Sequence, residues 1–131
     1  MLPSPTLRAG HETILVAEDE EPVRQFVVSA LRRYGYHVLE ASDGQEALKI
    51  SGEYGERIDL LLTDVVMPTM SGPELADRLA AARPETKILY MSGYTSDSIS
   101  TQGLLKPGVN HVAKPFGPDV LAEKVRLLLE A

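Results

Sequence analysis

The sequence contains no cysteine among its 131 residues, which excludes a disulfide framework and thiol chemistry. No apolar run approaches the roughly 20 residues that a membrane-spanning helix needs. Residues 1–11 (MLPSPTLRAGH) lack the apolar stretch of a signal peptide, and we assign them to a tail or linker rich in Pro and Ser. The lack of cysteine fits a reducing compartment, so we expect a cytoplasmic location.

Positive charge is also scarce, because 13 Lys and Arg residues face 19 Asp and Glu residues, for a net charge of -6. Nucleic-acid binding normally needs a basic surface, so we expect no nucleic acid as a partner of this domain and no membrane contact. With 44% hydrophobic residues, the chain is long enough to bury one ordinary core. We therefore assign residues 12–131 to a single domain.

Short apolar runs alternate with stretches of helical spacing along this domain. The spacing of Val23, Val27 and Leu31 is typical of a helix that buries one face. Apolar strands covered by helices on both faces predict an α/β protein with a doubly wound parallel sheet of five strands and five helices. A short, Ser-rich fourth helix is expected near Ser96–Leu104. The predicted strands are Ile14–Ala17, Tyr36–Ala41, Ile58–Thr63, Lys87–Met91 and Val109–Ala113.

Polar residues follow four of these strands. Ligands of such a sheet bind outside the carboxyl ends of its strands, and parallel strands bring those ends to one edge. We therefore expect several carboxylates, one hydroxyl and one ammonium group to converge there from distant parts of the sequence. The groups come from Glu18-Asp19-Glu20-Glu21 after the first strand, Asp64 after the third, Ser92 after the fourth and Lys114-Pro115 after the fifth.

Asp19 and Asp64 would face each other across neighbouring strands. Two carboxylates held that close repel unless a cation lies between them or one is protonated. Hard oxygen ligands with open water positions suit Mg²⁺. Glu18 would either bind the metal through water or only add negative potential, and the sequence leaves both open. Glu20 and Glu21 are assigned to the first turn of the next helix, where the helix dipole favours acids.

Asp64 has two interpretations, either to initiate the turn before Met67-Pro68 or to act as a nucleophile toward phosphorus beside a metal. Lys114, at the end of a buried strand, needs an anionic partner, unless it is only a surface lysine. The acid cluster or a bound phosphoryl group would provide that partner. The hydroxyl of Ser92 would donate a hydrogen bond to a phosphoryl oxygen. Lys114-Pro115 is also a candidate cis peptide.

Four segments in order combine these polar residues with their neighbours. They are Ile14-Leu-Val-Ala-Glu-Asp-Glu-Glu-Pro-Val-Arg24, Leu61-Leu-Thr-Asp64-Val-Val-Met-Pro68 with Ser71-Gly72, Tyr90-Met-Ser92-Gly-Tyr94 and Lys114-Pro-Phe116. Together they resemble the receiver domains of two-component signalling, over about residues 12–131. The resemblance implies a flavodoxin-like fold with strand order 2-1-3-4-5 and a phosphoryl-accepting response-regulator function without a separate enzymatic activity. It is greatest to the receivers of hybrid sensor histidine kinases, so we expect a fragment of such a kinase or a single-domain regulator.

The resemblance also implies a metal site. Asp64 matches the phosphorylated aspartate, and Glu18 and Asp19 match the acidic pair that binds Mg²⁺ or Mn²⁺. The backbone carbonyl of Val66 would complete the protein ligands. The phosphoryl donor would be a phosphohistidine on a histidine kinase or phosphotransfer domain, or a small acyl phosphate. Slow autodephosphorylation is expected.

The switch is carried over in the same way, with one departure. Ser92 matches the hydroxyl residue of the switch, and Lys114 matches the lysine that contacts the phosphoryl group. Family members often carry an aromatic residue three positions before that lysine, where this chain has His111. His111 either makes the switch pH-sensitive or is an exposed side chain without a role.

Phosphorylation is expected to change the surface of the fourth helix and fifth strand, around residues 92–116. Three rival classes remain. A flavodoxin-like cofactor carrier would need a phosphate-binding loop where Glu18-Asp19-Glu20-Glu21 would repel phosphate. A phosphohydrolase usually needs an acid or base beside the nucleophile, where Val65 and Val66 stand. A degenerate receiver, acting only as a protein-interaction module, is the serious alternative, and a homodimer is left open.

Overall fold

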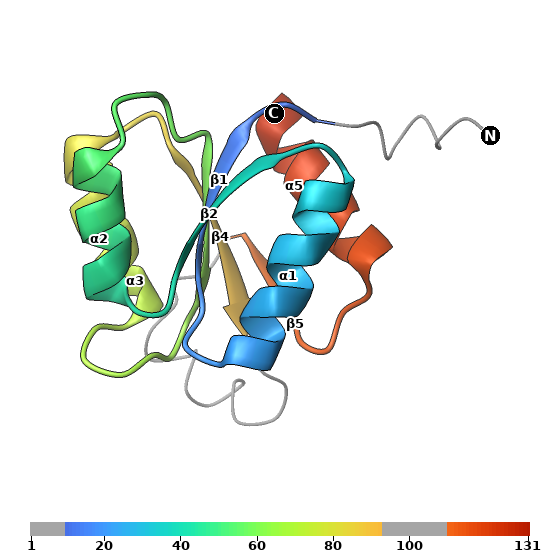
Figure 1. Ribbon diagram of the computed structural model, residues 1–131, viewed down its shortest axis with the longest axis horizontal. Helices are drawn as coiled ribbons and strands as arrows, with labels where there is room; N and C mark the ends of the chain where they lie inside the picture. Colours follow the sequence, from blue (N-terminus) through green and yellow to red (C-terminus); the bar gives the residue numbers. More distant parts are fainter. Residues whose placement is uncertain (1–9, 93–109) are drawn as a thin grey trace.

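The computed structural model describes residues 10–92 and 110–131 and contains a sheet of five parallel strands. The strand order is β2-β1-β3-β4-β5, so the predicted sheet and its order are confirmed. Figure 1 shows the sheet between two layers of helices. β3 is the central strand, between β1 and β4, and β2 and β5 are the edge strands. The strands are β1 (Thr13–Ala17), β2 (His37–Ala41), β3 (Leu60–Asp64), β4 (Lys87–Ser92) and β5 (His111–Ala113).

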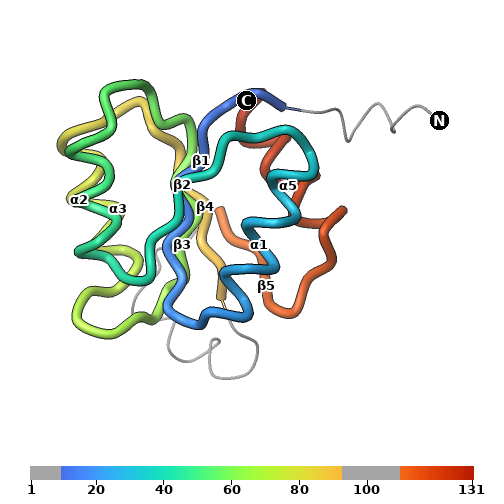
Figure 2. The backbone as a smooth tube through the Cα atoms, in the orientation of Figure 1, coloured from blue at the N-terminus to red at the C-terminus, as the bar shows by residue number. Residues whose placement is uncertain are grey.

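Helices cover both faces of the sheet. α1 and α5 lie together on one face, and α2 and α3 lie together on the other (Figure 2). This three-layer arrangement confirms the predicted doubly wound fold. The expected fourth helix, near Ser96–Leu104, lies outside the described residues. Within the described residues, no helix is long and apolar enough to cross a membrane. The helices are α1 (Glu21–Arg33), α2 (Gly44–Glu53), α3 (Gly72–Ala82) and α5 (Pro118–Glu130).

The core has two halves, one on each side of the sheet. Alternate residues of β1 serve the two halves: Ile14 and Val16 pack toward α1 and α5, whereas Leu15 and Ala17 pack toward α2 and α3. All five residues of β1 are buried, as expected for a parallel strand with a helix layer on each face. The buried sheet therefore holds the residues at the ends of its strands in place.

Two predicted strand ends were wrong by one residue, and both errors concern site residues. Asp64 and Ser92 are the last residues of β3 and β4, not the residues after them. Asp64 pairs with Met91, and Ser92 pairs with Ala113. The apolar pattern stops before the backbone pairing does, because a side chain at the sheet edge can be polar while its main chain stays in the ladder.

The starts of two predicted strands were also too early. β3 begins at Leu60, although Ile58 is fully buried, because the carbonyl of Ile58 accepts a hydrogen bond of 2.7 Å from the hydroxyl of Thr86. β2 begins at His37, because the amide of Tyr36 closes the turn after α1. Burial alone thus extends the predicted strands beyond their paired segments. Val109, the predicted start of the fifth strand, lies outside the described part of the chain.

The described chain is attached to the domain from Gly10 onward, close to the predicted boundary at residue 12. The amide of Gly10 donates to the carbonyl of Tyr34 at 2.7 Å. Both carboxylate oxygens of Glu12 accept from Arg126 of α5, at 2.5 and 3.3 Å. Burial raises the pKa of Glu12, but the Arg126 guanidinium outweighs it and lowers the pKa to about 2. The boundary itself stays a prediction.

The start of α3 is pressed against the end of β3 at Gly72. A Cβ atom at Gly72 would lie 2.1 Å from the backbone oxygen of Asp64, and the Gly72 amide donates to the Val65 carbonyl at 2.8 Å. Ser71 caps the helix, because its hydroxyl accepts from the amide of Glu74 at 3.2 Å. Only a residue without a side chain fits this close approach of two backbone segments.

We predict that Gly72→Ala lowers the free energy of unfolding by about 2 kcal/mol, because the new methyl group can be accommodated only by moving backbone. Urea unfolding measures this change. Gly52→Ala is the matched control, since nothing lies within 4 Å of a Cβ there, and we expect a gain of up to about 1 kcal/mol. Equal stability of Gly72→Ala and wild type would contradict the tight contact.

Candidate functional site

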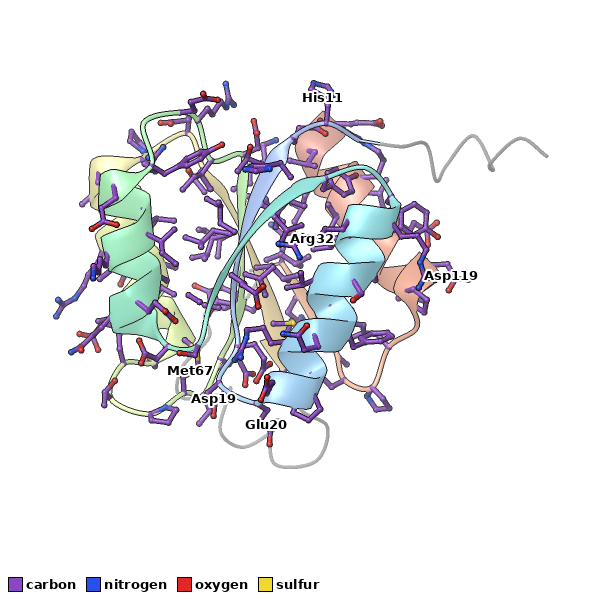
Figure 3. All side chains as sticks on the ribbon, viewed as in Figure 1. His11, Asp19, Glu20, Arg32, Met67 and Asp119 are labelled. Carbon is purple, nitrogen blue, oxygen red and sulfur yellow. The ribbon has the colours of Figure 1, made fainter. Side chains whose placement is uncertain are left out.

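The polar residues predicted to converge do meet at the carboxyl edge of the sheet. Glu18 and Asp19 follow β1, Asp64 ends β3, Ser92 ends β4 and Lys114 follows β5. Figure 3 labels Asp19 and Glu20 at this edge, beside the start of α1, with Met67 of the loop after β3 nearby. His11, which precedes β1, lies at the opposite edge.

Three carboxylates form a cluster at this edge. One oxygen each from Glu18, Asp19 and Asp64 lies within 4.8 Å of the others. The side chain of Glu18 is 0% exposed and that of Asp64 is 13% exposed, whereas Asp19 opens more to solvent. The amide of Glu20 donates to Oε2 of Glu18 at 3.0 Å, which fixes the buried carboxylate. The expected approach of Asp19 and Asp64 is confirmed.

Lys114 supplies a positive charge between two of these acids. Its Nζ lies 2.9 Å from Oε1 of Glu18 and 3.4 Å from Oδ2 of Asp64. The side chain is only 16% exposed, so the interpretation as a surface lysine was wrong. The backbone amide of Lys114 donates to the carbonyl of Ser92 at 2.7 Å, and the Lys114-Pro115 peptide is cis. The acid cluster is therefore the anionic partner.

The electrostatics of the cluster favour an added cation. Burial raises the pKa of Asp64 to about 6, and the neighbouring Glu18 carboxylate adds to this, while Lys114 opposes it. Burial also raises the pKa of Glu18 against the opposing effect of Lys114. Three carboxylates with one ammonium group leave an excess of negative charge. Hard oxygen donors with such an excess suit Mg²⁺ or a similar divalent ion.

The remaining predicted residues lie around this centre. Ser92 is buried with 5% of its surface exposed, at the end of β4. Val66, in the loop after β3, has an exposed side chain. His111 is exposed on the edge strand β5 and pairs in register with Tyr90. His111 and Ser92 come from neighbouring strands, but His111 is in register two residues before Ser92.

Sequence reasoning missed two features beside the site. Arg24 reaches back from α1, and its Nη1 donates to the backbone oxygen of Glu18 at 2.8 Å. A groove of about 390 Å³ also adjoins Lys114. Phe26, which is 42% exposed, lines it with Phe116, their ring centroids 6.1 Å apart. The available signal for Phe26 was its place outside the helical spacing of Val23, Val27 and Leu31.

We predict that Asp64→Asn stabilises the metal-free protein at pH 7.5 by about 2 kcal/mol, because it removes a buried charge that faces Glu18. The folded-state pKa of about 6 lies above the ordinary value of 3.8, so wild-type stability falls as pH rises between these values. The advantage of the variant is therefore absent below about pH 4 and complete above about pH 6.

Urea unfolding in EDTA across this pH range tests the prediction. Glu85→Gln, at an exposed acid far from the cluster in sequence, is the control and should change stability by less than about 0.5 kcal/mol. A variant less stable than wild type at pH 7.5 would show that Asp64 is held favourably in its charged form, contrary to the cluster's electrostatics.

Comparisons with known proteins agree with this geometry. The family model described as response regulator receiver domain matches residues 14–126. Sensor kinase CckA of Brucella abortus (strain 2308) is 39% identical over 93% of this chain, which spans only 13% of that kinase. The response regulator receiver protein CpdR of the same organism is 36% identical over 90% of this chain and 97% of its own length.

Solved structures place the chain in the same group. The crystal structure of the receiver domain from hybrid histidine kinase CckA matches with a TM-score of 0.75 and 38% identity, over 89% of this chain and 98% of that one. A receiver domain from Clostridium thermocellum matches with a TM-score of 0.79 and 26% identity, over 91% and 94% of the two chains. The sheet order and the acidic cluster agree with these matches, and this chain belongs to the response regulator receiver domain family of two-component signalling.

Proposed function

We propose that the domain accepts a phosphoryl group on Asp64 from a phosphohistidine in a two-component phosphorelay. The observation that carries this proposal is the placement of Asp64. Its carboxylate ends a central strand, within 4.8 Å of the Glu18 and Asp19 oxygens, and its Oδ2 is 3.4 Å from the ammonium of Lys114. Such a carboxylate can act as a nucleophile toward phosphorus once the negative charge around it is offset.

The carboxylates of Glu18, Asp19 and Asp64 would hold Mg²⁺ or Mn²⁺, with the backbone carbonyl of Val66 as a further ligand. Support for this comes from the hard oxygen donors and from the negative excess that burial creates at Asp64 and Glu18. Buried Glu18 already accepts from Glu20 and Lys114, so it is fixed before any ion arrives. When bound, the ion supplies positive charge that offsets the phosphoryl oxygens.

The protein's own groups would complete the transfer. An oxygen of Asp64 forms the bond to phosphorus as the bond from phosphorus to the histidine nitrogen breaks, with the two in line. Lys114, already 3.4 Å from Asp64, would pair with a phosphoryl oxygen. The hydroxyl of Ser92 would donate a hydrogen bond to another phosphoryl oxygen. Both residues come from strand ends, so little reorganisation is needed.

The donor would be a histidine kinase or a histidine phosphotransfer domain. The groove beside Lys114 supports a protein donor, because it pairs an exposed apolar wall, including Phe26, with a residue of the site itself. Exposed aromatic side chains are frequent anchors of protein interfaces. A small acyl phosphate, which reaches Asp64 without using the groove, would be the alternative donor.

The phosphoryl group would also change the surface near β5. It adds about 1.5 to 2 negative charges beside Lys114 and Ser92, by analogy with side-chain phosphoesters. These two residues are joined by a backbone hydrogen bond of 2.7 Å, so a change at one is felt at the next strand. His111, two residues before Ala113 on the short strand β5, would move with it. Residues 93–109 of the proposed switch lie outside the described chain.

Other parts of the proposal rest on the family and on composition. Self-phosphorylation and slow autodephosphorylation are the only activities proposed, in a cytoplasmic setting without nucleic-acid or membrane contact by this domain. The rival is a degenerate receiver that binds partners without phosphorylation, and a homodimer is compatible with either. Asp64, Asp19 and Lys114 are all present and close together, which favours the phosphoryl-accepting form.

Intact mass after incubation with acetyl phosphate tests the acceptor. We expect one phosphoryl adduct in wild type with Mg²⁺, and none with EDTA or in Asp64→Asn. Asp77→Asn, an exposed aspartate on α3, is the matched control and should be labelled like wild type. A phosphorylated histidine phosphotransfer domain used in place of acetyl phosphate tests the donor class. An unlabelled wild type that still binds Mg²⁺ would favour the degenerate module.

Amide hydrogen exchange tests the switch. With Mg²⁺ and beryllofluoride, which stands for the phosphoryl group on Asp64, we expect exchange to change by about threefold or more within residues 92–116, as on a shift between two populated states. The core of β1 and β3 should not change. Asp64→Asn under the same conditions is the control. Identical exchange in residues 92–116 with and without beryllofluoride would argue against the switch.

A further inference from the structure

Arg24 lies in the first turn of α1 but directs its side chain back toward the end of β1. Its Nη1 donates to the backbone oxygen of Glu18 at 2.8 Å. Its Nε lies 3.4 Å from Oε1 of Glu40 on β2. Only 14% of the Arg24 side chain is exposed. The guanidinium therefore links α1 to the end of β1 at Glu18 and to β2 at Glu40.

The contact with Glu18 bears on both metal-ligand candidates at once. The oxygen that Arg24 binds belongs to the planar peptide between Glu18 and Asp19. The amide of Glu18 is held from the other side, because it donates to the Ala41 carbonyl of β2 at 3.1 Å. Both hydrogen bonds hold the backbone of Glu18 and the plane of the Glu18-Asp19 peptide, which restricts the directions in which the two side chains leave the chain.

We propose that Arg24 is a positioning residue of the metal site, which holds the Glu18-Asp19 peptide so that both carboxylates face Asp64. The inference rests on the proposed function, because it assumes that these carboxylates bind a divalent ion. Glu40 holds the guanidinium in turn. Arg24 itself touches neither the ion nor the phosphoryl group and acts through Glu18.

Arginine is suited to this role. Its planar guanidinium donates in several fixed directions and stays charged, so it can serve the Glu18 carbonyl and the Glu40 carboxylate together. A lysine ammonium at this position could reach one of the two well, but not both with the same geometry. Without a donor, the partly buried carbonyl of Glu18 would turn to find another partner, and the peptide would lose its orientation.

The dissociation constant for Mg²⁺ is the decisive quantity, and NMR titration of the metal-free protein with Mg²⁺ measures it. We expect Arg24→Met to raise the Mg²⁺ dissociation constant about tenfold or more, which is the typical effect of removing a residue that orients a metal ligand. Arg24→Lys should have a dissociation constant between those of wild type and Arg24→Met, about threefold or more above wild type. Labelling by acetyl phosphate should recover toward the wild-type rate at saturating Mg²⁺, because Asp64 and Lys114 are untouched.

Arg32→Met is the matched control. Arg32 is on the same helix and lies 4.0 Å from the same Glu40, but its Nη2 donates to the Val38 carbonyl and not to Glu18. We expect it to leave the Mg²⁺ dissociation constant within twofold of wild type. An equal loss of affinity in Arg32→Met would overturn the proposal, since Arg24 would then act only through helix charge or general stability.

Thermal unfolding of each metal-free variant separates folding from metal binding. A folded Arg24→Met that binds Mg²⁺ like wild type would overturn the inference. If Arg24→Met does not fold, Arg24→Lys decides in the same way, since it keeps the charge and the aliphatic stem. Wild type that binds no Mg²⁺ would instead contradict the proposed function itself, so the two failures are distinguishable.

Discussion

The feature on which the site depends is the forced approach of three carboxylates at one edge of a rigid sheet. Glu18 is fully buried and Asp64 nearly so, yet their oxygens and one of Asp19 lie within 4.8 Å of one another. Burial of a charged carboxylate opposes folding, and the like charge of Glu18 at this distance adds to it, so that burial first and Glu18 second raise the pKa of Asp64. The apolar core of β1 and β3 on both faces holds the acids together regardless. The proposed divalent ion would relieve this repulsion.

Lys114 limits this repulsion without removing it. One ammonium group shared between Glu18 and Asp64 leaves the cluster with an excess of negative charge, which is the charge that the proposed divalent ion would offset. The same ammonium has a second use, because a phosphoryl group on Asp64 would present it with a stronger anionic partner. Its backbone is bonded to Ser92 at 2.7 Å. A change of partner at Lys114 would therefore be felt at both β4 and β5.

The apolar runs predicted the parallel sheet, and the polar residues after them predicted the convergence at its edge, whereas the strand order was implied by the resemblance to receiver domains. It missed that Asp64 and Ser92 lie within the strands, since backbone pairing continues beyond the apolar pattern. The contact of Gly72 with Asp64 and the return of Arg24 to Glu18 were beyond its reach. Both contacts depend on the path that the backbone takes after a strand ends, and the spacing of residue types does not determine that path.

The chain's connections lie away from the acids. The segment before β1 is fastened to α5 through Glu12 and Arg126, and Lys87, at the start of β4, donates to the carbonyls of Leu128 and Ala131 at the end of α5. Strand starts lie at the edge of the sheet opposite to the strand ends, so both attachments lie at the edge away from the acids. Among the described residues, the contacts that shape the site come from the carboxyl ends of β1, β3, β4 and β5, with support from α1 and β2. The two attachments are therefore separated from the carboxylates by the length of the sheet.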